Sequence, residues 1–223
     1  MELKGKRVAF LGDSITQGAG VNDINNRYDN VMKRECELAE VFNYGIGGTR
    51  IAYQSKPSSW PCHDLYFCGR AYLIPDRSDI VIVYGGANDY LHGDAPVGEI
   101  GDTSPATFAG AVRFLMDYLS TRFKDKTVVF LTPARMCIGD VDGSAPSTYP
   151  GKKPGGAPLG DYRNIIKETA KIYDLPVFDT YDMLGIDPTI DEDKEKYTSD
   201  GLHFNDAGHA ILAKKLAEFI SAL

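Results

Sequence analysis

Short apolar stretches alternate with segments of helical spacing along the whole chain, and this alternation restricts the possible folds more than any other feature. The apolar stretches are rich in β-branched and aromatic residues, which is typical of buried strands. Five strands are predicted, at Arg7–Leu11, Val41–Tyr44, Asp79–Tyr84, Thr127–Leu131 and Pro176–Phe178. Strands that alternate with helices predict a doubly wound parallel sheet, in which right-handed crossovers place helices on both faces.

The segments between the strands divide into helices and irregular stretches. Apolar residues at helical spacing predict helices at Tyr28–Leu38, Thr107–Phe123, about Gly160–Tyr173 and the end of the chain, where Asn205 or Asp206 can cap the helix. A further short helix is possible between Asp64 and Leu73. Three polar stretches are predicted to be irregular, at Tyr90–Pro105, Ile138–Leu159 and Asp182–Tyr197. A loop as long as Ile138–Leu159 is typical of a functional insertion beside a site.

Length and composition limit the class of protein. The 223 residues show no internal repeat and no linker-like shift in composition, so residues 1–223 are expected to form a single domain. The net charge of −7 argues against a nucleic-acid partner. No apolar run approaches the roughly 20 residues of a membrane span. The N-terminus lacks the apolar region of a signal peptide, so a cytoplasmic location is expected.

The cysteine pattern does not indicate a metal site. The four cysteines are scattered and form no CxxC pair, so no zinc site is expected. Reduced thiols are expected, with a disulfide between Cys62 and Cys68 as the alternative. The chain also lacks the G-x-G-x-x-G and G-x-x-x-x-G-K-[ST] patterns of nucleotide-binding loops.

Residues that could act as a nucleophile or as hydrogen-bond donors follow three of the predicted strands. Ser14 comes just after the first strand, the glycine-rich turn Gly45–Thr49 after the second, and Asn88 after the third. In open parallel sheets the working site lies outside the carboxyl ends of the strands. Ser14 therefore occupies the place of a nucleophile, and the alternative is a serine that caps the next helix.

A serine hydroxyl becomes a good nucleophile only when a base takes its proton. His203 can be that base, and Asp200, three residues earlier, can fix its tautomer and stabilise the imidazolium. The backbone N–H groups of Ser14 and of a turn glycine, with the amide of Asn88, can stabilise a developing oxyanion. The sequence thus combines the parts needed for acyl transfer.

The other histidines and the aromatic residues have less definite predicted roles. His63 and His92 fall in irregular segments and are expected to face solvent, and His209 is expected on the surface of the last helix. The stretch from Tyr53 to Pro75 is rich in aromatic residues. These rings either cover the sheet edge or, as for Trp60, line a site and stack on a substrate.

Four blocks of this sequence resemble, in order, the conserved blocks of the SGNH hydrolases, the superfamily of GDSL-type esterases and lipases. They are Gly12-Asp13-Ser14-Ile15, Asn43 through Gly48, Gly86-Ala87-Asn88-Asp89 and Asp200-Gly201-Leu202-His203. The blocks run from near the N-terminus to near the C-terminus, so the resemblance covers almost the whole chain. The resemblance implies a flavodoxin-like three-layer α/β/α fold with a five-stranded parallel sheet, and ester hydrolysis through an acyl-enzyme without metal or cofactor.

The resemblance also implies a role for each matching residue. Ser14 corresponds to the nucleophile, His203 to the base and Asp200 to the third member of the triad. Asn88 and Gly48 correspond to the oxyanion-hole residues that act with the Ser14 N–H. Gly48 fits the family's N-x-x-x-x-G spacing best, with Gly47 as the alternative.

The expected function is a serine esterase that acts on short acyl groups, above all acetyl, of small-molecule or carbohydrate esters. The alternative enzyme is a lysophospholipase or thioesterase for longer chains. A binding module without activity and a flavodoxin-like cofactor domain are two further hypotheses, and the four intact blocks argue against the first of them. Substrate-binding residues and oligomeric state are not assigned from the sequence.

Overall fold

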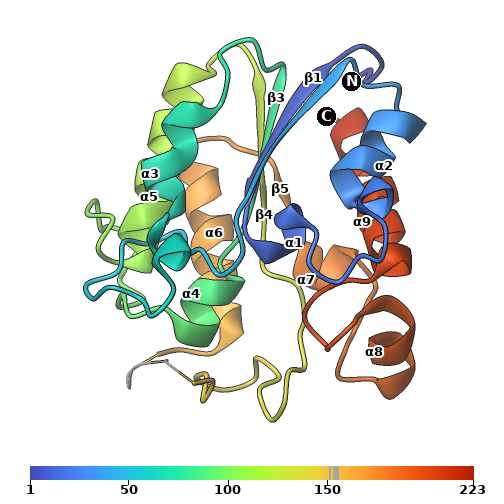
Figure 1. Ribbon diagram of the computed structural model, residues 1–223. Helices are drawn as coiled ribbons and strands as arrows, with labels where there is room; N and C mark the ends of the chain where they lie inside the picture. The colour runs from blue at the N-terminus through green and yellow to red at the C-terminus, as the bar shows by residue number, and fades with distance from the viewer. Residues whose placement is uncertain (151, 153–155) are drawn as a thin grey trace.

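The computed structural model describes residues 1–150, 152 and 156–223. Its five parallel strands form one sheet in the order β2-β1-β3-β4-β5 (Figure 1). The strands are β1 (Arg7–Gly12), β2 (Glu40–Gly45), β3 (Ile80–Tyr84), β4 (Thr127–Leu131) and β5 (Val177–Phe178). This confirms the predicted α/β fold with a five-stranded parallel sheet, and each strand lies within two residues of its predicted limits.

Helices cover both faces of the sheet (Figure 1). One layer contains α3 (Phe67–Arg70), α4 (Ala87–His92), α5 (Phe108–Arg122) and α6 (Leu159–Ile172). The other contains α1 (Ser14–Gln17), α2 (Tyr28–Glu35), α7 (Thr180–Met183), α8 (Asp191–Tyr197) and α9 (Asp206–Ser221). The described residues also form three 3₁₀ turns, η1 (Ile24–Asn26), η2 (Pro61–Asp64) and η3 (Ala71–Leu73). No helix among these described residues has both the length and the apolar character to cross a membrane.

The two layers have separate apolar cores because side chains alternate along each strand. In β1, Ala9 and Leu11 belong to the cluster under α5, whereas Val8 and Phe10 belong to the cluster under α2 and α9. All four side chains are fully buried. Strand β1 is thus held on both faces, which makes it a rigid base for the residues that follow it.

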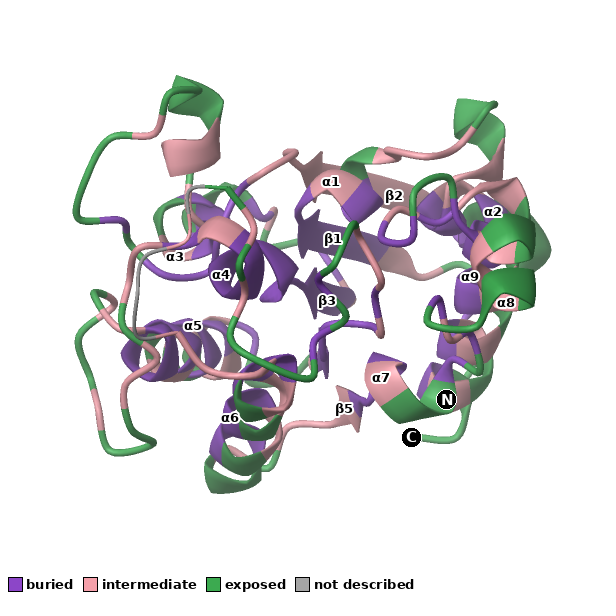
Figure 2. Ribbon diagram, turned by 90° about the horizontal axis from the view of Figure 1, so that it is seen from below, coloured by how far each residue is buried: buried purple, intermediate pink, exposed green. Residues whose placement is uncertain are grey.

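The strand register brings three loops to one level at the carboxyl edge of the sheet. Gly12 at the end of β1 pairs with Gly45 of β2 and with Tyr84 of β3. Figure 2 views this edge, with α1 and α4 in front of the buried strands. The loops after β1, β2 and β3 therefore start side by side.

Two predicted irregular stretches contain helices. The prediction for Tyr90–Pro105 missed the end of α4, and the prediction for Asp182–Tyr197 missed α8 and the end of α7. Helix α8 has no buried residue, so apolar spacing could not reveal it. Its acidic first turn and its lysines near the end suit the helix dipole.

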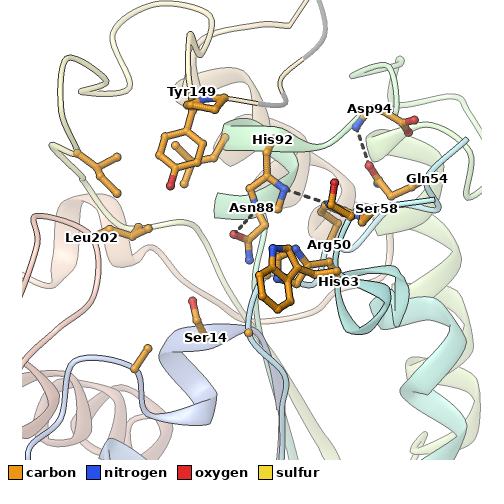
Figure 3. Close-up of a pocket in the computed structure, with 18 of the residues that line it drawn as sticks. Ser14, Arg50, Gln54, Ser58, His63, Asn88, His92, Asp94, Tyr149 and Leu202 are labelled. Atoms are coloured by element: carbon orange, nitrogen blue, oxygen red, sulfur yellow. Dashed lines mark hydrogen bonds between the residues drawn. The ribbon is translucent and has the colours of Figure 1, made fainter. Parts of the chain in front are cut away.

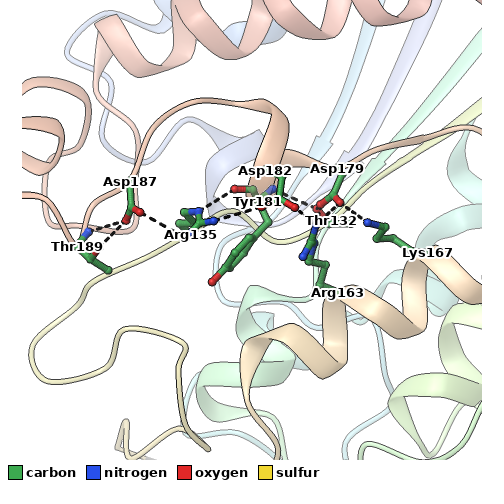
Figure 4. Close-up of polar contacts among 9 residues, drawn as sticks. All are labelled: Thr132, Arg135, Arg163, Lys167, Asp179, Tyr181, Asp182, Asp187 and Thr189. Carbon is green, nitrogen blue, oxygen red and sulfur yellow. Dashed lines mark hydrogen bonds and ion pairs between the residues drawn. The ribbon is translucent and has the colours of Figure 1, made fainter.

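A polar network holds the loops after β4 and β5 together (Figure 4). Asp179 accepts hydrogen bonds from Arg163 Nε at 2.8 Å and from Thr132 Oγ1 at 2.9 Å. Arg135, in the loop after β4, donates to the carbonyl oxygen of Tyr181 at 3.0 Å. The Arg135 and Arg163 guanidinium groups both face the Tyr181 ring, at 4.2 and 5.0 Å from its centroid. This network fixes α7 against α6 at the carboxyl edge.

Candidate active site

Ser14 is the first residue of α1, directly after β1. The helix is capped by Asp13, whose carboxylate accepts a hydrogen bond from Ile15 N at 3.1 Å. The Ser14 hydroxyl is thus not needed as a cap, and the alternative role considered from the sequence is wrong. Instead the hydroxyl lies at the carboxyl edge of the sheet and lines a pocket (Figure 3).

Ser14, His203 and Asp200 form a continuous chain of hydrogen bonds. Ser14 Oγ lies 2.8 Å from His203 Nε2, and His203 Nδ1 lies 2.7 Å from Asp200 Oδ2. Asp200 Oδ1 also accepts from the backbone N–H groups of His203 at 2.8 Å and Leu202 at 2.9 Å. Because an ionised carboxylate only accepts, the proton of the neutral imidazole is on Nδ1 and Nε2 faces the serine hydroxyl. This is the arrangement that a serine nucleophile and its general base require.

The charges in this chain shift two pKa values. Burial alone would raise the pKa of Asp200, but its hydrogen bonds with His203 and Leu202 outweigh burial and lower the pKa to about 2. Burial alone would lower the pKa of His203, but the hydrogen bond and charge of Asp200 outweigh it and raise the pKa above 6.5. The pair therefore favours the imidazolium that forms when a histidine takes a proton from serine.

The pH dependence of ester hydrolysis is expected to follow His203. Only neutral His203 can accept the serine proton, so kcat/KM should fall as pH decreases through its raised pKa, with a midpoint above 6.5. Steady-state kinetics on one soluble ester between pH 5 and 9 measure this midpoint. In Asp200→Asn the residual activity should have a lower midpoint, because the charge that raises the pKa is gone. An unchanged rate down to pH 5 in the parent would contradict this role of His203.

The loop that carries Asp200 and His203 is held by the loop after β4. Gly201 has φ of +88°, and a Cβ added to it would lie 1.9 Å from the carbonyl oxygen of Cys137. Cys137 N also donates to the Gly201 carbonyl oxygen at 2.8 Å. Only glycine permits this approach. The backbone between Asp200 and His203 is thereby fixed.

Asn88 lies in the first turn of α4, with its side chain between Ser14 and His92 (Figure 3). Its Nδ2 donates to the Thr49 carbonyl oxygen at 3.0 Å, and its Oδ1 lies 3.1 Å from His92 Nε2. The second N–H of the amide has no hydrogen bond to any described residue, and Asn88 lines the pocket beside Ser14. This N–H is available to a negatively charged oxygen.

Of the two backbone N–H groups considered from the sequence, those of Gly47 and Gly48, only one is free to bind an oxyanion among the described residues. Gly47 N donates to Gln17 Oε1 at 2.7 Å, whereas no hydrogen bond between described residues uses the Gly48 N–H. Gly48 has φ of +72°, and the His63 ring lies so close that an added Cβ would be 2.2 Å from His63 Nε2. The geometry therefore favours Gly48 over Gly47 as an oxyanion donor.

The pocket above Ser14 is open and has a volume of about 810 Å³. More than half of the residues that line it are polar or charged, and Trp60 and Tyr149 add aromatic rings. Trp60 is 69 % exposed, so much of its ring is available to a ligand. Ile138 and Tyr149 come from the long loop predicted as an insertion beside the site. Residues 151 and 153–155 of that loop lie outside the described residues.

Two of the three other histidines, His92 and His209, lie where the sequence did not predict them. His63 and His92 line the pocket, and His92 belongs to α4. His209 is fully buried and accepts a hydrogen bond from Tyr28 N at 3.2 Å, so the predicted surface position is wrong. Burial lowers the pKa of His209 to about 4, which keeps its ring neutral.

The cysteines and acidic residues do not assemble a metal site in the part of the chain that the structure describes. No group of three or more His, Cys, Asp or Glu side chains there is placed to hold an ion. All four cysteines are free, so the alternative disulfide between Cys62 and Cys68 is absent.

Comparisons with known proteins indicate the family and the fold. The model of the GDSL-like Lipase/Acylhydrolase family matches residues 10–211. A solved protein structure from Lactobacillus plantarum has 29% identity and a TM-score of 0.82, with 98% of each chain covered. A lipase/acylhydrolase from Enterococcus faecalis shares the fold at 20% identity and a TM-score of 0.61, covering 97% of this chain and 96% of its own.

A carbohydrate acetylesterase family member from Sinorhizobium meliloti also shares the fold. It has 16% identity and a TM-score of 0.61, with 97% of this chain and 98% of the other chain covered. A search of curated proteins gives no match.

Proposed function

Because this chain belongs to the GDSL-like lipase/acylhydrolase family, a family of ester-hydrolysing enzymes, we propose that it is a serine esterase for short-chain acyl esters. The observation that carries the proposal is the hydrogen-bonded chain Ser14–His203–Asp200 at the floor of an open pocket. Residues 1–223 are proposed to act as a single domain of this type.

In the proposed reaction, His203 Nε2 takes the hydroxyl proton as Ser14 Oγ attacks the ester carbonyl carbon. The carbonyl oxygen becomes an oxyanion, which accepts hydrogen bonds from the Ser14 N–H, the Gly48 N–H and the Asn88 amide. The C–O bond to the alcohol then breaks, and His203 gives its proton to the departing alcohol. Water attacks the acyl-enzyme with the same base, and the acid and free Ser14 are released.

The polar lining of the pocket supports a short acyl group. Arg50, Gln54, Ser58, His63 and Asp94 all line it. A long acyl chain needs a continuous apolar wall, because covering its methylene groups with polar side chains gives up the roughly 0.8 kcal/mol that each buried CH₂ contributes. Acetyl has only one methyl group to bury, so it is the acyl group that the pocket suits best.

The exposed ring of Trp60 supports a carbohydrate as the alcohol part of the ester. An aromatic face beside an open pocket stacks on the apolar face of a sugar, while polar neighbours bind its hydroxyl groups. The Sinorhizobium meliloti acetylesterase family member shows that this fold occurs among carbohydrate acetylesterases. An acetylated sugar is therefore the proposed substrate class.

The acyl preference can be tested with p-nitrophenyl esters from acetate to decanoate, assayed beside acetylated sugars. The expected result is the highest kcat/KM on acetate, a fall by about tenfold or more at octanoate, and release of acetate from the sugars. Values of kcat/KM that rise steadily with chain length would contradict the proposal and favour a lysophospholipase or thioesterase.

A further inference from the structure

Asn88 is the only proposed oxyanion donor that is a side chain, so its amide must be held in one orientation. A flipped amide would present its oxygen to the developing oxyanion and repel it. The contact with the Thr49 carbonyl oxygen requires the nitrogen on that side. The other contact of the amide is with His92, one helical turn later in α4.

Arg50 determines which nitrogen of His92 carries the proton. Arg50 NH1 lies 3.0 Å from His92 Nδ1, and a guanidinium group can only donate. Nδ1 must therefore accept, and the proton of neutral His92 is on Nε2. Nε2 then donates to Asn88 Oδ1, which leaves the Asn88 nitrogen facing Thr49 and the pocket.

Arg50 is itself fixed, because its side chain is 3 % exposed and pairs on its other side. Its NH2 donates to Ser58 Oγ at 2.6 Å and to Asp64 Oδ1 at 2.9 Å. Asp64 also accepts from Ser58 N at 2.8 Å. The row from Asp64 through Arg50 and His92 to Asn88 thus has a defined donor at every contact. Figure 3 shows its part from Arg50 to Asn88.

We propose that Arg50 and His92 are positioning residues that hold the Asn88 amide with its nitrogen toward the oxyanion. The proposal rests on the esterase function given above. His92 is suited to this task because burial, and then the charge of Arg50, lower its pKa to about 4. The charge of Lys152, and that of His63 when it is protonated, lower the pKa of His92 in the same direction. His92 therefore keeps one tautomer over the pH range in which His203 changes charge.

A double-mutant cycle tests this role. His92→Phe keeps a ring and removes both nitrogens, and it is expected to lower kcat by about 10–100-fold with KM within about threefold. Asn88→Ala is expected to lower kcat by about 10²–10³-fold. If His92 acts through Asn88, adding His92→Phe to Asn88→Ala should change kcat by less than about twofold. Losses that multiply in the double variant would overturn the proposal.

Two further variants separate positioning from a general structural effect. His92→Gln keeps a donor near the Nε2 position and should recover part of the lost kcat. Tyr90→Phe, on the same helix, removes the buried donor to the Ala145 carbonyl oxygen and should leave kcat within about twofold of the parent. An equal loss in Tyr90→Phe would show that any disturbance of α4 is sufficient, which contradicts the proposal.

The predicted tautomer of His92 can also be tested on the folded protein without an activity assay. ¹⁵N-detected NMR of the His92 ring should show a protonated Nε2 and an unprotonated Nδ1 at every pH from 5 to 8. The other tautomer, or titration in this range, would overturn the proposal. Full activity of Ser14→Ala would instead contradict the serine mechanism itself, so the two failures are distinguishable.

Discussion

The Ser14→Ala variant is expected to lose about 10⁶-fold in kcat, because alanine leaves His203 with no hydroxyl to activate. The Ser14 Oγ to His203 Nε2 contact of 2.8 Å is the only serine contact that His203 Nε2 makes among the described residues. Removing Ser14 and His203 together should cost no more than removing either, since members of a triad act as a unit. Steady-state kinetics on p-nitrophenyl acetate measure all three variants.

The matched control for Ser14→Ala is Ser78→Ala. Ser78 is fully buried before β3, at the opposite end of the strands from the pocket, and this variant should keep the activity of the parent. Mass spectrometry of phosphonate-treated protein should locate the adduct on Ser14 and find none in Ser14→Ala. An adduct on another residue, with Ser14→Ala still active, would rule out Ser14 as the nucleophile.

The Asp200→Asn variant is expected to lose about 10⁴-fold in kcat, less than the loss of the nucleophile. An asparagine amide can donate to His203 Nδ1, which places the imidazole proton on Nε2. That proton then faces Ser14 Oγ, and the ring can no longer accept from the hydroxyl. The loss should appear mainly in kcat, because Asp200 contacts His203 rather than the ester.

Asp125→Asn serves as the control for this change. Asp125 is exposed in the turn between α5 and β4, away from the pocket, and the substitution makes the same change of charge. Its kcat should remain within about twofold of the parent. If Asp200→Asn behaves like Asp125→Asn, the carboxylate does not set the tautomer of His203.

The strands that bury apolar side chains on both faces, and the helices that bury them on one face, could be predicted from the sequence. Strands β1, β3 and β4 and helices α5, α6 and α9 bury apolar side chains at regular spacing, and β2 packs half-buried ones against both cores. Helix α8 buries nothing, so its amino-acid pattern is that of a polar loop. Apolar spacing detects burial, and it fails where a helix is stabilised by its charges and by its contacts with α9.

The polar residues of the site could likewise be predicted only where a local sequence pattern indicated them. Ser14, Asn88 and His203 were candidates because each follows a strand or carries an acidic neighbour, and both signals are local. The role of His92 depends on Arg50, which is 42 residues away in sequence. Its position four residues after Asn88 is the local signal that could have indicated it, once α4 was recognised as a helix.

The buried position of His209 could have been predicted from its helical spacing in the sequence. It lies three residues before Leu212 and seven before Leu216, which are both fully buried. Helical spacing therefore places His209 on the buried face of α9. Residue polarity suggested a surface position, but burial keeps the imidazole neutral, and the Tyr28 N–H supplies a hydrogen-bond partner for its Nδ1.

One wall of the pocket is bound to the proposed acid–base pair and the other to the proposed oxyanion donor Asn88. This difference matters for directed evolution of the substrate range. Ile138 follows Cys137, whose backbone is bound to Gly201 between Asp200 and His203. Ser58, on the other wall, is bound through Arg50 and His92 to Asn88. In the proposed mechanism, mutations that reshape the first wall are expected to disturb proton transfer, and mutations that reshape the second wall are expected to disturb binding of the oxyanion. Libraries that vary one wall at a time would therefore reveal which half limits the adaptation to a new ester.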